Sequence, residues 1–472
     1  MRRWTAVAWA ALAVATLITC VGTLRNDYRD ATLVGDQASQ LMQSVSLAHG
    51  GNLSYDAADL RNYAHATWRV RYRPPAGLLF QRHGDGWAFA KPYGYSLVVA
   101  PFLKALGPTH GVAVANTLLL LALLAVCIAL LRLRLSGPAV PLTALALVLV
   151  SNVVPYAYVL YVELFTALVV GVAAYGLLRA ARDASRWAAL IGFAATGLAL
   201  AEKSTLAFAL GPLALVALVR LPGLRSKLPA VAAGVVVFGL AVLPYWHYSD
   251  HRSISPYGGE RYATRGGEVP FSDPPAPADR YGRSSTNETL SGSFVRHALG
   301  ESWRGKARSA ATYVVGRHTG VLVFMPIAVV VAALALLTGK RMSAPGVAIL
   351  GGLALYALVY VVLFTDNYYG GGQSYGNRYF VQVCPLIAAL AAAAPIPSRR
   401  LVVGALASIV FGLVVLWPGL RHPSTAVEHI ERTTALQRVF PFESNQAGAV
   451  RFRCGVTTPR GPREACVAAY DP

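Results

Sequence analysis

Apolar stretches of about 20 residues recur along the whole of this 472-residue chain. A helix needs roughly 20 mostly apolar residues to cross the hydrocarbon core of a bilayer. The candidate spans are residues 4–24, 111–131, 138–156, 158–178, 187–201, 204–220, 229–248, 319–338, 344–364, 379–395 and 401–418. The pattern predicts an all-α polytopic protein of the lipid bilayer with about 11 transmembrane helices.

The charge composition points the same way. Only 14% of the residues are charged, whereas a soluble chain normally carries about 25%. The net charge of +20 falls partly in short loops between apolar stretches, where basic residues indicate membrane topology. We therefore expect a lipid environment and no nucleic-acid partner.

The distribution of basic residues decides how residues 94–107 are placed. This apolar segment is short and ends at Gly107-Pro108. If it does not span and the N-terminus is cytoplasmic, every short loop on the cytoplasmic side is basic. These loops carry Arg2, Arg3, Arg132, Arg134, Arg179, Arg182, Arg186, Arg220, Arg225, Lys227, Lys340, Arg341, Arg399 and Arg400. We predict a multi-pass protein of the cytoplasmic (inner) membrane, with residues 94–107 as an interfacial or re-entrant helix on the outer face.

Three polar regions then lie outside, on the periplasmic side. Residues 25–110 and 249–316 are outer loops of a membrane module spanning residues 1–418, and residues 419–472 form an outer tail that holds the C-terminus. The tail contains Cys454 and Cys466, and a closely spaced pair in an oxidising compartment is expected to form a disulfide.

Asp36 is the first candidate for chemistry. It follows Gly35 and precedes a segment with helical periodicity, residues 38–49. An aspartate at a helix start can cap the helix, which stabilises it by about 1 kcal/mol. Alternatively, a carboxylate at the outer membrane surface can act as a general base toward an acceptor hydroxyl.

Several later residues fall on the same predicted side. Lys91 and Tyr93 precede the interfacial segment, and the lysine is either a snorkelling residue or a phosphate ligand. Glu163 is an acid in an apolar span, which marks it as a functional candidate. Lys203 either pairs locally with Glu202 or binds an anion.

Two segments near the later spans add further candidates. Arg317 and His318 open the span at 319–338 and suit either an interfacial anchor or a phosphate clamp. The loop at 366–380 is dense in glycine and aromatic residues and contains Gln373, Tyr375 and Arg378. Tyrosine faces suit sugar rings, and the arginine fork suits a phosphate.

In their order and shared side, these segments resemble the GT-C superfamily of integral membrane glycosyltransferases. Its members include protein O-mannosyltransferases, aminoarabinose transferases and actinobacterial arabinosyl- and mannosyltransferases. The resemblance rests on Gly35-Asp36-Gln37, the 91–101 stretch, Tyr161-Val162-Glu163, residues 316–326 and Tyr375-Gly376-Asn377-Arg378-Tyr379. It implies a GT-C fold with outer-face loops and interfacial helices.

The resemblance also implies a reaction: inverting transfer of a hexosyl or pentosyl group from a polyprenyl-phosphate donor to a hydroxyl of a glycan, glycolipid or protein in the cell envelope. Asp36 is the expected base. Lys91, Lys203, Arg317, His318 and Arg378 are expected to bind the donor phosphate, and Tyr93, Glu163, Gln373 and Tyr375 to contact the substrate. No metal ligand is assigned, because Gln37 replaces the second acid that many relatives carry, although a divalent cation stays open as a cofactor.

Two other functions remain open on the sequence. A flippase or transporter of lipid-linked sugars would also need basic residues at the membrane surface, but it should carry polar groups deep in several spans. A transferase of the O-antigen-ligase type would use a pyrophosphate-linked donor, and the long loop at 249–316 suits it. Mid-span positions here are apolar, which favours surface chemistry over passage.

Overall fold

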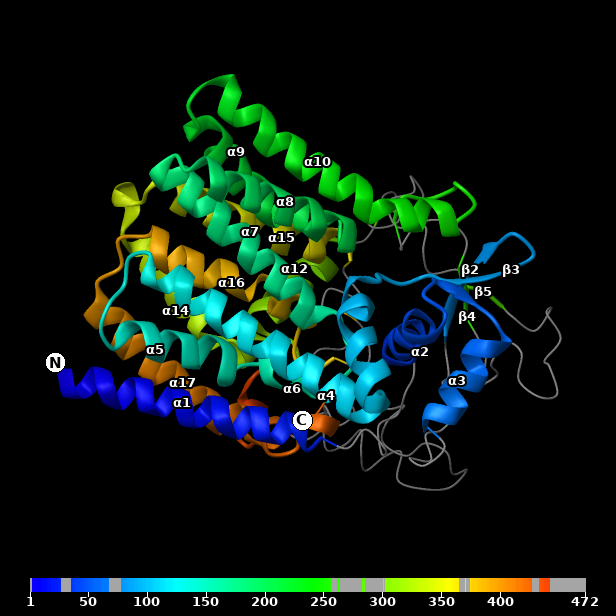
Figure 1. Ribbon diagram of the computed structural model, residues 1–472. Coiled ribbons are helices and arrows are strands. Elements are labelled where there is room, and N and C mark those ends of the chain that lie inside the picture. Colours follow the sequence, from blue (N-terminus) through cyan, green and yellow to red (C-terminus); the bar gives the residue numbers. More distant parts are fainter. Residues whose placement is uncertain are drawn as a thin grey trace.

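The computed structural model describes residues 2–26, 35–67, 78–255, 261–263, 282–284, 300, 302–364, 370, 374–426 and 433–441. These residues form a helical bundle with a small sheet at one end (Figure 1). Among the described residues, six helices are long and apolar enough to cross a membrane: α1 (Arg2–Leu24), α4 (Gly94–Arg132), α7 (Glu163–Asp183), α10 (Gly223–Tyr248), α15 (Ala344–Leu363) and α17 (Ser398–Arg421). The protein is therefore a multi-pass helical membrane protein.

Shorter helices lie in the five other predicted spans. They are α5 (Ala139–Ala144) with its π-helical continuation η3 (Leu145–Leu149), α8 (Arg186–Glu202), α9 (Leu206–Arg220), α14 (Pro326–Leu337) and α16 (Arg378–Ala393). Each is shorter than the roughly 20 residues that a full crossing requires. The predicted count of about 11 spans is therefore not confirmed.

Two predicted spans are broken in the structure, and two segments that were predicted as separate are joined. The interfacial segment and the following span form one helix, α4, interrupted at Gly107, whose φ is 78°. The predicted span at 138–156 ends after η3 and resumes as α6 (Val153–Ala157). The predicted span at 319–338 splits at Met325 into α13 (Val321–Phe324) and α14.

Two of these breaks meet in space. The Asn152 backbone N–H donates to the Phe324 carbonyl at 3.0 Å, and its side-chain amide donates to the Asn377 carbonyl at 2.9 Å. Non-helical backbone at membrane depth needs such protein partners, because lipid offers no hydrogen bonds. The breaks therefore support the turn that precedes Arg378, the first residue of α16.

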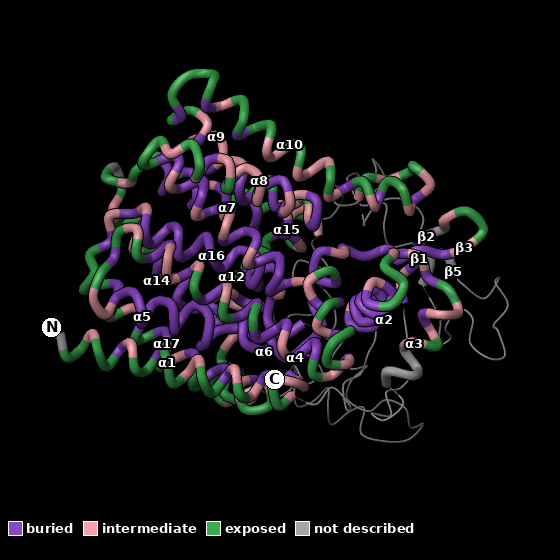
Figure 2. Tube along the Cα trace, viewed as in Figure 1, coloured by how far each residue is buried: buried purple, intermediate pink, exposed green. Residues whose placement is uncertain are grey.

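The outer helices of the bundle keep apolar surfaces exposed, as contact with lipid requires. Figure 2 shows α1 and α10 as largely exposed or half-buried, whereas α7 and α16 are buried. The exposed residues of α10 include Leu228, Val235, Leu240 and Leu243. Inside the bundle, α7 and α8 approach closely at Gly176, where a Cβ would lie 2.6 Å from Gly192 Cα. Small residues at such crossings are typical of membrane helices.

Loops that the charge rule assigns to one side lie at one end of the bundle. Arg182 donates to the Leu133 carbonyl at 2.9 Å, which joins two basic loops, and Ser343 Oγ donates to the Ala393 carbonyl at 2.8 Å. In Figure 1 the N-terminus lies at one end of the bundle and the sheet at the other. The grouping of the loops matches the prediction, while the assignment of the sheet end to the outer side stays a prediction.

The sheet end departs from the predicted all-α fold. Five short antiparallel strands are arranged in the order β1-β3-β2-β4-β5. They are β1 (Ser54–Tyr55), β2 (Leu79–His83), β3 (Gly86–Phe89), β4 (Arg261–Ala263) and β5 (Gly282–Ser284), and α2 (Asp36–His49) and α3 (Ala57–Thr67) lie beside them. The sheet joins the two predicted outer loops, because β2 from the first pairs with β4 from the second.

A buried carboxyl in this region predicts a pH-dependent stability. Burial raises the pKa of Asp59 to about 6, against the effect of the hydrogen bond that it accepts from the Asp56 backbone N–H. An aspartate whose pKa is raised on folding favours the folded state at low pH, and that contribution is lost between about pH 4 and pH 6. The thermal midpoint of the purified wild type should therefore fall over this range, and Asp59→Asn should flatten the dependence. Equal slopes for both proteins would contradict the burial of this carboxyl.

The described part of the C-terminal tail packs on the membrane module. We call residues 433–441 the tail segment; it includes a 3-10 turn, η7 (Gln437–Val439). Arg317 Nη2 donates to the Arg438 carbonyl at 2.9 Å, Arg317 Nε to the Phe440 carbonyl at 3.1 Å, and Gln437 Nε2 to the Arg317 carbonyl at 2.8 Å. Cys454 and Cys466 lie outside the described residues, so their predicted disulfide stays a prediction.

Candidate functional site

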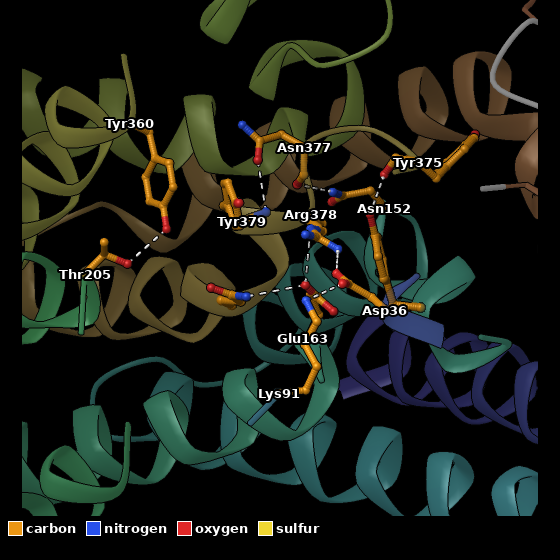
Figure 3. Close-up of polar contacts among 12 residues, drawn as sticks. Asp36, Lys91, Asn152, Glu163, Thr205, Tyr360, Tyr375, Asn377, Arg378 and Tyr379 are labelled. Carbon is orange, nitrogen blue, oxygen red and sulfur yellow. Dashed lines mark hydrogen bonds and ion pairs between the residues drawn. The ribbon is translucent and has the colours of Figure 1, made fainter. Parts of the chain in front are cut away.

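Asp36 lies at the start of α2 but does not cap it. The N-cap residue is Gly35, with φ 61°, and no side-chain hydrogen bond caps this helix. The two carboxylate oxygens of Asp36 instead contact separate cations: Oδ1 pairs with Lys91 Nζ, and Oδ2 accepts from Arg378 Nη1 at 2.7 Å (Figure 3). The capping interpretation of Asp36 is therefore wrong, and three predicted site residues meet at one point.

Lys91 is held by the helix that carries Asp36. Gln43 Nε2 donates to the Lys91 carbonyl at 3.2 Å, and Gln40 Nε2 donates to the Pro92 carbonyl at 3.0 Å. The two glutamines are three residues apart and so share one face of α2. Their amides fix the backbone that follows β3, and the Lys91 side chain, 10% exposed, reaches Asp36 from it.

Arg378 is positioned by a sharp turn at the start of α16. Gly376 has φ 66°, and a Cβ there would lie 2.6 Å from the Phe324 ring, so both the backbone and the space favour glycine. Asn377 Oδ1 then accepts from the Tyr379 backbone N–H at 2.9 Å and caps the helix. This turn directs the Arg378 side chain between α2 and α7, with 16% of it exposed.

Glu163 supplies a second carboxylate on the other side of Arg378. It is the first residue of α7 and only 2% exposed. Its Oε1 lies 3.6 Å from Arg378 Nε and 3.5 Å from Gln382 Nε2, and Tyr356 OH donates to Gln382 Oε1 at 3.2 Å. Oε2 is buried without a hydrogen-bond partner.

Lys203 completes the group and lies on tyrosine faces. Its ammonium is 3.4 Å from the ring centroid of Tyr379 and 5.4 Å from that of Tyr360. Cation–π contacts of this kind hold a positive charge without neutralising it. In the part of the chain that the structure describes, no carboxylate forms an ion pair with Lys203. The local pair with Glu202 is not observed, since Glu202 Oε1 accepts instead from the Gly94 backbone N–H at 3.1 Å.

We call Asp36, Lys91, Glu163, Lys203 and Arg378 the charge cluster. With all five ionised, three cations face two carboxylates, which leaves an excess of one positive charge. Burial alone would raise the pKa of Asp36, but the charges of Lys91 and Arg378 outweigh it and hold that pKa well below its usual range. The cluster can therefore accept a further anion, while Asp36 in its present position is a weak base.

Two other predicted substrate contacts are engaged in packing. Tyr93 follows Lys91 by two residues, but its OH donates to the Ala241 carbonyl of α10 at 2.8 Å. Tyr375 OH donates to the Leu416 carbonyl at 3.3 Å, and the Tyr375 ring meets Phe324 edge-on with centroids 5.2 Å apart. Gln373 lies outside the described residues.

Arg317 contacts the tail segment, and neither it nor His318 takes part in the ion pairs that hold Asp36. Both residues are buried. The Arg317 guanidinium donates to carbonyls of the tail segment, so it fixes the tail in the manner of an anchor. These contacts agree with the anchor interpretation of Arg317, and the phosphate clamp at 317–318 stays a prediction.

Sequence reasoning assigned no individual role to four residues that shape the site. Gln382 contacts Glu163, Tyr379 supports Lys203, Asn152 braces the turn, and Asn377 caps α16. A usable signal existed for Asn152 and Gln382, because each is a lone amide within an apolar stretch, and such groups need partners. Across the described residues no three His, Cys, Asp or Glu side chains gather in a way that could hold a metal ion.

Comparisons with known proteins do not extend this description. No protein-family model, curated protein or solved structure matches the chain. The function must therefore be inferred from the site itself.

Proposed function

We propose that the protein is a glycosyltransferase that moves a sugar from a polyprenyl-phosphate donor to an acceptor hydroxyl at the outer membrane surface. The acceptor oxygen attacks the anomeric carbon, and the bond from that carbon to the phosphate oxygen breaks. The phosphate leaves with the electron pair, and the acceptor proton passes to Asp36. Direct displacement inverts the anomeric configuration.

The charge cluster is the observation that carries this proposal. A leaving phosphate gains negative charge in the transition state, and fixed cations stabilise that charge. Lys91 and Arg378 come from separate parts of the chain and pair with one carboxylate, Asp36, while Lys203 lies on the Tyr379 ring within electrostatic range of it. Glu163 is the second carboxylate of the cluster, so three cations face two carboxylates, and the one extra positive charge supports an anionic ligand.

Aromatic side chains beside the cluster support a sugar as the transferred group. The guanidinium carbon of Arg378 lies 5.5 Å from the ring centroid of Tyr161 and 5.7 Å from that of Tyr379. Tyrosine presents an apolar face and a polar rim, which suits a sugar ring with its hydroxyls. The cluster also lies near the start of α7 and α16 and the end of α8, where a lipid-linked phosphate at the membrane surface would reach it.

The proposal is tested with purified protein in proteoliposomes and a panel of radiolabelled polyprenyl-phosphate sugars. One donor should lose its sugar to an added acceptor glycan, with release of the polyprenyl phosphate. Failure to consume any donor, together with movement of a labelled lipid between leaflets, would favour the flippase and contradict the transferase.

Lys203 offers a selective test of the donor-phosphate role. Lys203→Met keeps the apolar stem on the tyrosine faces and removes the charge. A hydrogen bond to a charged group is worth about 1.5–3 kcal/mol, so the KM for the donor should rise about 10- to 100-fold. The matched control is Lys104→Met, since Lys104 is an exposed lysine of α4, and its KM should stay near that of the wild type. An equal, small effect of both variants would remove Lys203 from the donor site.

A further inference from the structure

The Asp36 carboxylate lies between Lys91 and Arg378 and contacts each of them through a different oxygen. One oxygen pairs with the ammonium, and the other accepts from Nη1 of the guanidinium at 2.7 Å. The side chains of the three residues are 26%, 10% and 16% exposed for Asp36, Lys91 and Arg378. Both cations are thus already paired with a carboxylate of the chain.

A phosphodiester has the same requirements as this carboxylate. It carries a single negative charge shared by two non-bridging oxygens, and lysine and arginine bind it through charge-assisted hydrogen bonds. We propose that Asp36 is a stand-in for the donor phosphate, which displaces its carboxylate from Lys91 and Arg378 when the donor binds. This inference rests on the proposed function and adds an order of events to it.

Electrostatics favour exchange over simple addition. If the phosphodiester entered while Asp36 stayed paired, the phosphate and Asp36 would both contact Lys91 and Arg378. Glu163 would be a third negative group beside Arg378. Like charges this close are unfavourable in a poorly solvated site. Lys203 has no carboxylate partner within the described residues and can contact the incoming phosphate first, which lowers the cost of the exchange.

The exchange would also turn Asp36 into a useful base. While it is paired, the cations hold its pKa well below the usual range, so it has little affinity for the acceptor proton. Once Lys91 and Arg378 bind the phosphate, Asp36 loses both pairs and its proton affinity increases. The donor must therefore bind before the acceptor hydroxyl can be activated, which protects the enzyme from unproductive chemistry.

The binding test uses farnesyl methyl phosphodiester, which carries one charge and no sugar. Its affinity for the purified full chain is measured by isothermal titration in detergent for the wild type, Asp36→Asn and, as the matched control, Asp183→Asn. Removal of the competing carboxylate should tighten binding at least about tenfold in Asp36→Asn and leave Asp183→Asn unchanged. Unchanged or weaker binding in Asp36→Asn would overturn the stand-in role.

A second measurement needs no variant. Asp36 is surrounded by Lys91, Arg378, Glu163, Lys203 and Tyr379. The pH profile of kcat/KM for the donor reports the free enzyme, in which Asp36 is paired. The profile of kcat/KM for the acceptor at saturating donor reports the donor complex. The acid limb of the second profile should lie at higher pH than that of the first. If the acid limbs of the two profiles coincide, the inference is wrong. The proposed transferase function would still stand, because turnover was observed. If neither turnover nor phosphodiester binding occurs in wild type or Asp36→Asn, the proposed function fails and the inference fails with it.

Discussion

Replacing Asp36 with asparagine should lower kcat for sugar transfer by about 10²- to 10⁴-fold, the range typical of a lost general base. Asparagine keeps the size and can still accept from Arg378, but it cannot take the acceptor proton. The measurement is initial rates at saturating donor and acceptor in proteoliposomes. A lower kcat together with tighter phosphodiester binding would show that Asp36 acts as the base and is not needed to bind the phosphate.

The control for this variant is Asp183→Asn. Asp183 ends α7 and pairs with Arg179 on the surface, whereas Glu163 of the cluster begins the same helix. A helix of this length places them about 30 Å apart. Asp183→Asn should keep the wild-type thermal midpoint within a few degrees, whereas Asp36→Asn should lower it, because Lys91 and Arg378 lose the carboxylate that pairs with both. A near-normal rate for Asp36→Asn would remove Asp36 as the base.

The second large effect is expected at Arg378, where the contribution to stability can be measured separately from the contribution to sugar transfer. Arg378→Ala leaves Glu163 buried without a cation, and breaking a buried pair by removing one partner costs about 3–5 kcal/mol. Thermal stability in detergent should fall accordingly. The double variant Arg378→Ala/Glu163→Gln removes both charges and should recover much of that stability.

Transfer should not recover in the double variant. The guanidinium fork toward the donor phosphate is missing in both proteins, so the KM for the donor should stay raised by about 10- to 100-fold. Arg179→Ala, which breaks an exposed pair worth about 0–1 kcal/mol, serves as the control for stability. Restored transfer in the double variant would show that Arg378 only balances the charge of Glu163.

The sequence predicts much of the membrane architecture and little of the local breaks. Apolar stretches located the long helices, because exclusion of charge from hydrocarbon leaves a direct pattern. The same criterion treated residues 138–156 as one span, yet the helix breaks near Asn152, whose side chain bonds a residue 225 positions away. A hydropathy pattern carries no information about a hydrogen-bond partner so distant in the sequence.

The sheet was not predicted for a different reason. Its strands are only two to five residues long, and strands of that length carry too few residues to show an alternating pattern. Their stability depends on pairing between two segments that are separated by the α4–α10 region. Tertiary context of this kind overrides local propensity.

The candidate site was predicted in part. Loop charges grouped Asp36, Lys91, Lys203 and Arg378 at one end of the bundle, and the structure brings them together. The same reasoning assigned Arg317 to the phosphate, whereas it binds tail carbonyls. A basic residue at a span end has the same appearance in the sequence whether it meets a ligand or the backbone of its own chain.

The central claim is that the charge cluster binds the donor phosphate. The most direct test is an electron cryo-microscopy structure of the full chain with a donor analogue in which a phosphonate replaces the sugar phosphate. We expect the phosphonate oxygens within hydrogen-bond distance of Lys91 and Arg378, with Asp36 moved away from both cations and toward the anomeric carbon. Density for the phosphonate elsewhere, with the Asp36 pairs to Lys91 and Arg378 intact, would contradict it.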